Sequence, residues 1–317
     1  MSRGLGDVYK RQIEIKEDRV IVALGTGEVE VPVIKEPKTS FELPGMYPLG
    51  ALRVQTSELK KCLNSVLYII DKGDGAQWMN CVGMIPYKND DVTKLSFIGS
   101  GTVGIATSNL SVEESTLNGA MPNMAVPVAA FSTAAKYLGG EITLINIMAK
   151  GEANNLGESS KPFALLLVDS TGATFLISLH SQEYSAKMLD IAVDTNNTAK
   201  FKATVEGKDI ANAIRVASVG EEHVGVVISE DKNGIGIFES KTRKKGAVVK
   251  ANTSGELAGD VIVNGYYLSK CVSIYSGDIL IKSNIGGVIG EPAVVCVVGN
   301  EGFSILLPIK NRADEKV

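Results

Sequence analysis

The sequence predicts an α+β fold made of repeated domains, each with two short helices packed on antiparallel sheets. One observation is a strand–helix–strand pattern that occurs twice, at residues 125–147 and 260–282. A second is a strand–helix pattern at residues 52–70 and again at 201–218. A third is a series of apolar hairpins with glycine turns. Self-similarity at a domain-sized period indicates duplicated domains rather than a solenoid.

The strand–helix–strand pattern is clearest in residues 260–282. A β-branched run predicts its first strand, and a second apolar run predicts its last. Between them, Leu268 and Val272 recur at helical spacing, which predicts a short helix. Gly140 stands in the earlier copy where Gly277 stands in the later one, so the two copies are 137 residues apart.

The second pattern opens each full domain with a strand that leads into a helix. In the first copy, Thr56-Ser57 is expected to cap the helix. Leu59 corresponds to Ile210 in the second copy, an offset of 151 residues. This offset exceeds the first one, and the polar loop at residues 150–161 accounts for the difference. The apolar positions expected to face the core are Leu59, Leu63 and Val66 in one copy and Ile210, Ile214 and Ala217 in the other.

The hairpins divide the chain into domains. Those at residues 163–179 and 293–310 each close a full domain, and residues 13–35 carry a similar hairpin with no strand–helix core before it. We therefore expect this first hairpin to be the tail of a domain whose front is missing. The expected divisions are a non-native or disordered leader at 1–12, a C-terminal domain remnant with a proline-rich linker at 13–50, full domains at 51–198 and 199–311, and a charged tail at 312–317.

The composition is that of a globular protein without a membrane span. Apolar residues make up 44% of the chain, yet no apolar run approaches the roughly 20 residues that cross a bilayer. The net charge of −4 argues against strong attraction of the whole molecule to nucleic acid, although a basic face can lie on an acidic body. Cysteine pairs at zinc-site spacing are absent. We expect a cytoplasmic protein with buried, reduced thiols at Cys62, Cys81, Cys271 and Cys296.

One glycine pattern raises the alternative of a nucleotide-cofactor enzyme. Gly99, Gly101 and Gly104 satisfy G-x-G-x-x-G after an apolar strand, the arrangement that binds NAD-type dinucleotides. That fold needs an amphipathic helix next, whereas the following residues are rich in serine, threonine and asparagine. A strand–turn is therefore the preferred interpretation. The two histidines, His180 and His223, have no partner at a recognisable spacing, so no catalytic residue is expected.

The expected helices carry more basic than acidic side chains. Glu58 and Asp209 are the acidic exceptions, and both lie in first helical turns, where the helix dipole favours them. A solvated helix face explains such charge by itself. If the repeats pack side by side, however, equivalent helices line one surface, and their cations can contact DNA phosphates without reading sequence. The candidate DNA-binding residues are Lys60, Lys61, Lys136, Lys208, Arg215 and Lys270.

Repeated β-rich domains with two short helices each resemble the bacterial DNA polymerase III beta subunit, the sliding clamp. Four local matches occur in the family's order along residues 13–310. Residues 25–34 resemble the hairpin that ends the family's first domain, and residues 78–83 resemble the strand that opens the second domain's sheet. Residues 263–268 resemble the segment before the last helix. Residues 307–310, Leu-Pro-Ile-Lys, are similar to the family's C-terminal Met-Pro-Met-Arg.

The resemblance implies a DNA-clamp fold and a protein without catalytic activity, metal or cofactor. Such a clamp is a homodimeric ring of three domains per chain that encircles double-stranded DNA without sequence preference. It tethers the replicative DNA polymerase, and binds its clamp loader, through a hydrophobic pocket between the second and third domains. Apolar groups there would accept leucine and phenylalanine side chains of a partner's short linear motif. Carried over by position, the pocket residues are Met79, Ser100, Thr102, Val103, Ile105, Ile305, Leu307, Pro308 and Ile309.

Three departures from the family pattern predict a divergent clamp. Residues 100–105 lack the Asp, Gly and Arg of the family's turn, which bears on partner specificity. The front of the first domain is absent; in the family that domain meets the third domain of the other subunit, so ring closure depends on it. The chain also continues past the family's end, through residues 311–317. A further hypothesis is a β-rich assembly protein that kept the fold and lost DNA binding.

Overall fold

The chain forms two compact units, Met1–Pro44 and Gly45–Val317. The predicted tail, the loop at 151–160 and the predicted leader lie outside the described residues, except that the first strand begins at Gln12. The computed structural model describes residues 12–15, 19–24, 27–32, 45–71, 80–89, 92–117, 123–150, 161–219, 225–257, 259–275, 277–284, 294–300 and 302–308.

The first unit contains a small antiparallel sheet. Its strands, in sheet order, are β1 (Gln12–Ile15), β2 (Arg19–Leu24) and β3 (Gly27–Pro32). Leu24 pairs with Gly27, so β2 and β3 form the predicted hairpin, whose turn lies outside the described residues.

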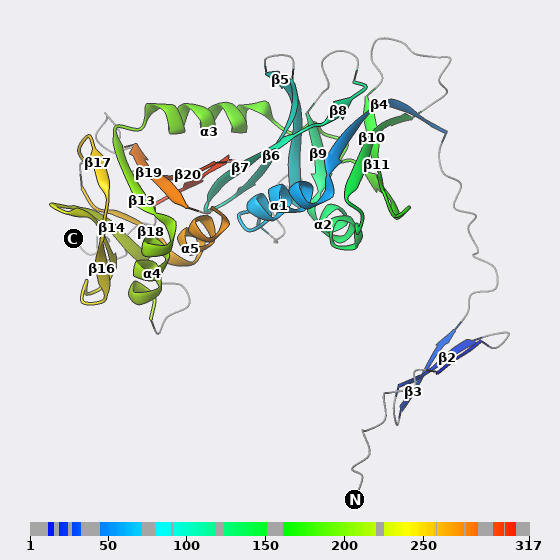
Figure 1. Ribbon diagram of the computed structural model, residues 1–317, viewed down its shortest axis with the longest axis horizontal. Coiled ribbons are helices and arrows are strands. Elements are labelled where there is room, and N and C mark those ends of the chain that lie inside the picture. The colour runs from blue at the N-terminus through cyan, green and yellow to red at the C-terminus, as the bar shows by residue number, and fades with distance from the viewer. Residues whose placement is uncertain are drawn as a thin grey trace, which may run out of the picture. The chain divides into compact units, whose positions relative to one another are not determined.

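The second unit contains two successive repeats with the same order of elements (Figure 1). The first repeat consists of β4 (Met46–Gln55), α1 (Thr56–Leu67), β5 (Cys81–Asn89), β6 (Val92–Gly101), β7 (Gly104–Ser111), β8 (Glu114–Ser115), β9 (Met124–Pro127), α2 (Val128–Tyr137), β10 (Ile142–Lys150), β11 (Pro162–Asp169) and β12 (Thr174–Ser178). The second consists of β13 (Phe201–Glu206), α4 (Gly207–Ala217), β14 (Gly225–Asp231), β15 (Gly234–Glu239), β16 (Gly246–Lys250), β17 (Asn252–Ser254), β18 (Val261–Asn264), α5 (Gly265–Ile274), β19 (Asp278–Asn284), β20 (Val294–Gly299) and β21 (Gly302–Leu306). Helix α3 (Ala186–Thr198) joins them.

The sheets repeat in the same way as the elements. The sheet β12-β11-β10-β4-β8 of the first repeat has its equivalent in β21-β20-β19-β13-β17 of the second. Likewise β7-β6-β5-β9 corresponds to β16-β15-β14-β18. Strand β21 pairs with β7, where Ile305 lies opposite Ile105, and this pairing fuses two of the four sheets into one of nine strands. The two repeats are therefore joined by continuous backbone hydrogen bonding.

The helix positions confirm both sequence offsets. Helices α2 and α5 begin at Val128 and Gly265, which are 137 residues apart, and α1 and α4 begin at Thr56 and Gly207, which are 151 apart. The apolar positions predicted to face the core are all buried against the sheets: Leu59, Leu63, Val66, Ile210, Ile214 and Ala217.

Two local expectations were wrong. Helix α1 has no side-chain cap, because it starts directly from β4: the Thr56 N–H donates to the Glu141 carbonyl at 2.8 Å and the Thr56 hydroxyl bonds Thr143 instead. The end of the segment predicted as linker is a strand, since β4 begins at Met46 and pairs with β10 as far as Lys150.

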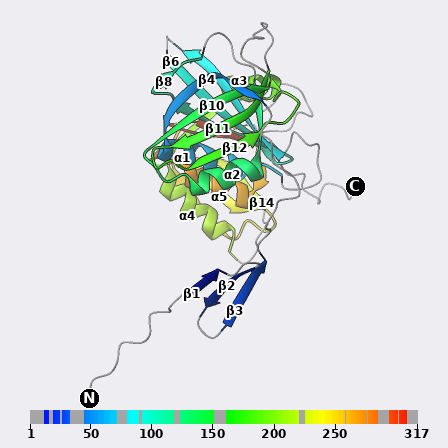
Figure 2. The ribbon, with the colours of Figure 1, turned by 90° about the vertical axis from the view of Figure 1, so that its right-hand side faces the viewer.

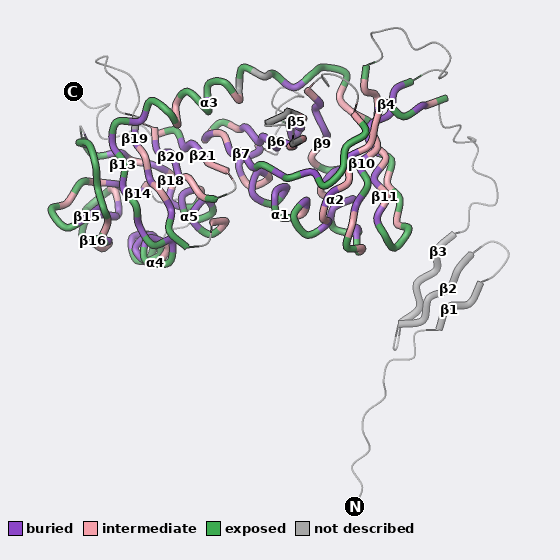
Figure 3. The backbone as a smooth tube through the Cα atoms, turned by 45° about the horizontal axis from the view of Figure 1, so that its top comes forward, coloured by how far each residue is buried: buried purple, intermediate pink, exposed green. Residues whose placement is uncertain are grey.

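Helix α3 was not predicted. Figure 3 shows it largely as an exposed segment, and Ala192 is its one fully buried residue among those whose side chains are described. Its sequence therefore has no broad apolar stripe from which a helix could be recognised.

Candidate nucleic-acid interface and partner site

Four helices of the second unit lie on one side of its sheets. Figures 1 and 2 show α1, α2, α4 and α5 together on that side and α3 on the opposite one. Helix α1 packs beside α2, and α4 packs beside α5. Equivalent helices of the two repeats thus share a surface, which is called the helix face below.

The helix face is more basic than the chain as a whole. Its four helices contain six lysines or arginines and two acidic residues, whereas α3 has one lysine and two aspartates. The whole chain carries a net charge of −4, so these four helices differ in sign from the chain as a whole. Of the predicted DNA-binding residues, Lys60 is half-buried and the others are exposed: Lys61, Lys136, Lys208, Arg215 and Lys270.

A groove of about 260 Å³ separates α1 from α2 on the helix face. The Lys60 ammonium donates a hydrogen bond to the Leu138 carbonyl, which holds it at the junction of the two helices. Lys60 and Lys136 line opposite walls, so their ammonium groups can approach the same anion. The lining residues are Lys60, Asn64 and Leu67 from α1 and Ser132, Ala135 and Lys136 from α2.

Two of the exposed lysines lie over tyrosine rings. The Lys136 ammonium is 5.6 Å from the centre of the Tyr137 ring, and that of Lys270 is 5.5 Å from the Tyr266 ring. Tyr137 is 62% exposed, so its hydroxyl is available to solvent. Tyrosine hydroxyls can add neutral hydrogen bonds to phosphates beside the cationic ones.

The structure brings the two halves of the predicted partner site together. The Leu307 N–H donates to the Val103 carbonyl at 2.9 Å, just beyond the pairing of Ile105 with Ile305. Thr102 and Leu307 are exposed, while Val103, Ile105 and Pro308 are half-buried. Ser100 and Ile305 are buried, and Met79 and Ile309 lie outside the described residues.

Two residues that sequence reasoning missed hold this site in place. The Asp71 carboxylate accepts hydrogen bonds from the Thr102 N–H at 2.6 Å and from its hydroxyl, which fixes the β6–β7 turn. Tyr184 lies across the sheet, with its hydroxyl 3.0 Å from that of Ser100. A Cβ on Gly83 would collide with the Tyr184 ring, so only glycine lets the ring lie flat there. Neither residue stands in a recognisable motif.

The same arrangement occurs in solved structures of bacterial sliding clamps. A beta sliding clamp from C. crescentus matches at TM-score 0.67 and 15% identity, over 94% of this chain and 75% of that one. The sliding clamp from Bacillus subtilis matches at 0.67 and 16%, over 94% and 74%. A putative DNA polymerase III beta subunit from Eubacterium rectale matches at 0.69 and 11%, over 94% and 76%. This chain has the sliding-clamp fold. No family model and no curated protein matches its sequence.

The clamp fold explains the glycine pattern and agrees with the strand–turn interpretation preferred above, rather than with the dinucleotide alternative. After Gly104 the chain continues as strand β7, so the helix that would bind a pyrophosphate is absent at this position. A Cβ on Gly99 or Gly101 would clash with a carbonyl at the end of α1, and one on Gly104 would clash with the Ile305 carbonyl. These glycines permit close packing of a helix and a strand rather than cofactor binding.

The junction between the two repeats of the clamp fold also contains a buried polar cluster. The Tyr68 hydroxyl, at the end of α1, donates to the Ser304 hydroxyl at 2.8 Å and lies 3.0 Å from the Cys271 sulfur. Burial raises the pKa of Tyr68 well above its usual value and that of the Cys271 thiol to about 12. Both groups are therefore neutral at physiological pH and hold the junction by hydrogen bonding.

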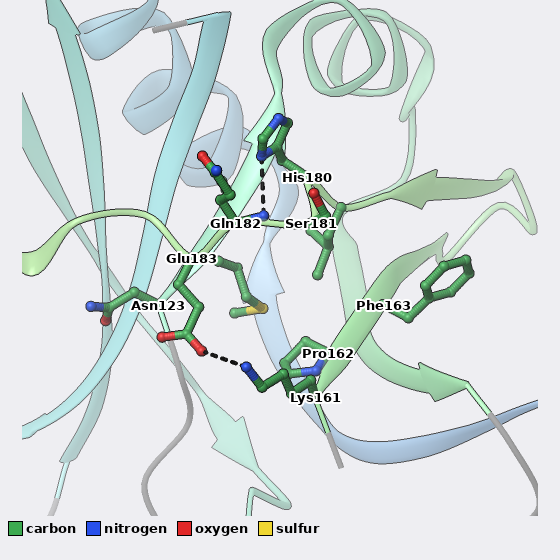
Figure 4. Close-up of a pocket in the computed structure, with 11 residues that line it drawn as sticks. Asn123, Lys161, Pro162, Phe163, His180, Ser181, Gln182 and Glu183 are labelled. Carbon is green, nitrogen blue, oxygen red and sulfur yellow. Dashed lines mark hydrogen bonds and ion pairs between the residues drawn. The ribbon is translucent and has the colours of Figure 1, made fainter. Parts of the chain in front are cut away.

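A small pocket of about 130 Å³ lies beside the segment that leads into α3 (Figure 4). Lys161 and Glu183 form an ion pair of 3.8 Å across it, and the Gln182 N–H donates to the His180 ring at 3.2 Å. No sequence pattern indicates it, because its walls come from the start of β9, the start of β11 and the residues after β12. The lining residues are Asn123, Met124, Ala125, Lys161, Pro162, Phe163, Leu179, His180, Ser181, Gln182 and Glu183.

Nothing in the described part of the clamp fold resembles a metal centre. No group of three or more histidine, cysteine or acidic residues is placed to hold an ion among the residues described. All four cysteines are buried and unbridged, as expected. No helix among the described residues is long and apolar enough to cross a membrane.

Proposed function

We propose that this protein is a DNA sliding clamp that encircles duplex DNA and tethers a DNA polymerase for processive synthesis. One observation carries the proposal: equivalent helices of two repeats present exposed lysines and an arginine on one shared side. Such a surface suits sequence-independent contact with phosphates, and its modest charge is compatible with sliding. The role is structural rather than catalytic, and the protein acts in the cytoplasm.

We assign residues 51–198 and 199–311 to two clamp domains, with residues 13–50 as the end of another. The edge strands support a ring of more than two repeats. Strand β21 pairs with β7, whereas the equivalent strands β12 and β16 end their sheets within the described part of the chain. Strands β12 and β16 can therefore each pair with a strand of a further domain. Such pairing is what we expect where two identical chains close a ring.

We assign the partner site to the junction of β7 and β21. Exposed Leu307, half-buried Val103 and half-buried Ile105 offer apolar contacts there. Leucine and phenylalanine side chains of a polymerase or clamp-loader segment fit such a surface.

Retention on circular DNA tests the proposal. The protein is incubated with a nicked circular plasmid, the complex is isolated by gel filtration, and the plasmid is then cut with a restriction enzyme. A clamp stays on the circle and slides off after cutting. Equal retention on circular and cut DNA would contradict encirclement and would favour a surface-binding protein.

A matched pair of charge reversals tests the helix face. Lys208→Glu changes an exposed residue on α4, and Lys187→Glu makes the same change on α3, on the opposite side. The first is expected to weaken retention and the second to leave it unchanged. Equal effects of the two variants would remove the helix face from the proposal. If the unaltered protein binds no DNA at all, the β-rich assembly hypothesis is favoured.

A further inference from the structure

Helix α3 packs against Ile105 and Ile305, two residues of the proposed partner site, on one face of the nine-stranded sheet. Ala192 packs in one buried cluster with Cys296 of β20 and Ile305 of β21. Ile105 packs against this cluster, and it also packs against a second one, which contains Tyr184 and is flanked by Leu189. The segment from Tyr184 to Ala192 therefore covers the apolar side of the β7–β21 junction.

The contacts of α3 have the spacing of a helix bound in a groove. Leu189, Ala192 and Asn196 stand at i, i+3 and i+7, and all three face the sheet: Leu189 and Ala192 through packing, Asn196 through hydrogen bonds. Helical peptides held in hydrophobic grooves use the same spacing for their anchors. Helix α3 thus occupies the junction in the way a bound partner would.

Helix α3 is held weakly for an element in that position. The residue of α3 that is fully buried against the sheet is Ala192, whose side chain is a single methyl group and buries little apolar area. The outer side of α3 exposes Ile191 and Val193, and among its described side chains only Ala192 is fully buried. At its C-terminal end, the Lys282 ammonium donates to the Asn196 carbonyl at 3.2 Å and to its side-chain oxygen at 2.9 Å. These two hydrogen bonds connect the C-terminal end of α3 to the partly exposed Lys282 of β19, and they are called the tether below.

We propose that α3 is an internal occupant of the partner site, and that a partner segment carrying leucine or phenylalanine binds by displacing it. This inference rests on the partner site proposed above. A larger anchor than Ala192 buries more apolar area against Ile105 and Ile305, so an external segment can outcompete the helix. While α3 is seated, the apparent affinity for a partner is reduced by the fraction of molecules in which the site is open.

Variants that loosen α3 test the proposal. Ala192→Glu places a charge in the buried anchor position, and Ile191→Glu makes the same kind of change on the exposed side of the helix. Lys282→Ala removes the tether, and Lys202→Ala removes the exposed lysine that pairs with it across β13 and β19. Binding of a fluorescein-labelled decapeptide with a Leu-Leu-Phe centre is measured by anisotropy, and hydrogen exchange of the α3 amides is measured in parallel.

Ala192→Glu and Lys282→Ala are expected to bind the peptide about fivefold or more tighter than the native protein does. The controls Ile191→Glu and Lys202→Ala are expected to bind it with the native affinity. The peptide should also accelerate exchange of the α3 amides in the native protein. If Ala192→Glu and Lys282→Ala open the helix but bind no tighter than their controls, α3 is a structural connector and the inference fails. If no variant binds the peptide although α3 is open, the partner site itself is wrong. DNA retention is scored separately, so either failure leaves the DNA proposal intact.

Discussion

Neutralising one lysine on each helix of the helix face is expected to flatten the salt dependence of DNA binding. The four changes are to glutamine, which removes the charge and leaves a polar side chain one atom shorter than that of lysine. All four positions are exposed, so the free energy of unfolding should change by no more than about 0.5 kcal/mol per site. The substituted residues are Lys61 on α1, Lys136 on α2, Lys208 on α4 and Lys270 on α5.

The expected magnitude follows from counterion release. If all six basic side chains of the face contact phosphates, the logarithm of the association constant falls against log salt with a slope of about −5.4. Binding then weakens roughly 2,000-fold between about 50 and 200 mM salt. With only Lys60 and Arg215 left, the slope becomes about −1.8 and the loss about 12-fold. Six is the maximum number of contacts from the helix face of one chain. The measured native slope can be smaller than this maximum gives, but the quadruple variant should still have the shallower slope.

The assay is a salt titration of anisotropy with a labelled duplex, which needs no ring closure. Lys208→Gln alone should reduce the slope by about 1, and the control Lys187→Gln on α3 should not change it. A quadruple variant with the native slope would refute the reasoning, because the contacts would then lie elsewhere. A weaker affinity with an unchanged slope would indicate loss of folding rather than of phosphate contacts.

Three further predictions concern stability. Gly104→Ala should lower the free energy of unfolding by about 1–3 kcal/mol, because its Cβ would clash with the Ile305 carbonyl, whereas Gly139→Ala, which meets open space, is a near-neutral control in urea denaturation. Tyr68→Phe should cost about 1 kcal/mol in the same assay, because it removes the hydroxyl that bridges the repeats; an unchanged stability would contradict a role for that bond. Asp169 accepts hydrogen bonds from a threonine hydroxyl and four backbone N–H groups, which hold its pKa well below the usual range. Its ionised form therefore stabilises the fold above the unfolded pKa of about 3.9, and this contribution is lost as pH falls through the folded value. Asp169→Asn should lower Tm at neutral pH, and the gap from the native protein should close in acid; a gap that stays constant with pH would show that the charge is not involved.

The repeats could be predicted from the sequence because each copy carries its own local signals. A β-branched strand, an apolar pair at helical spacing and a glycine turn recur in the same order in both copies. Both copies keep these signals because the helix of each copy must bury its apolar side against a sheet. Leu268 and Phe131 illustrate this, because both are fully buried and stand 137 residues apart. The resemblance to the clamp family placed the residues of β7 and β21 in one pocket, but the backbone pairing of the two strands was not predicted, because it depends on how two repeats meet rather than on either repeat alone.

The glycine pattern shows why a motif must be read together with the element that follows it. Gly99 and Gly101 are two residues apart on one strand, so both face the end of α1. The motif for a pyrophosphate has the same spacing because it also requires close backbone approach. Only the element that follows distinguishes the two, and here that element is a strand.

Helix α3 could not be predicted because its sequence lacks a broad apolar stripe. A helix is recognised from sequence by an apolar stripe. Among the described side chains of α3, Ala192 alone is fully buried, while Ile191 and Val193 face solvent. The consequence extends to the site: Ser100 and Ile305 were predicted to line a pocket, and their burial depends on the segment from Tyr184 onward covering them. That is a property of tertiary packing which neighbouring residues do not encode.

Opposite faces of one strand connect the two proposed activities. On β6, Gly101 packs against the end of α1 on the side of the helix face, and the next residue back, Ser100, bonds Tyr184 on the side of α3. The sheet between them is one hydrogen-bonded layer that runs through both repeats. A partner that replaces α3 would therefore bind without obstructing the side on which we propose that DNA lies. Because both faces share this layer, DNA and a polymerase segment can be held at the same time, as tethering requires.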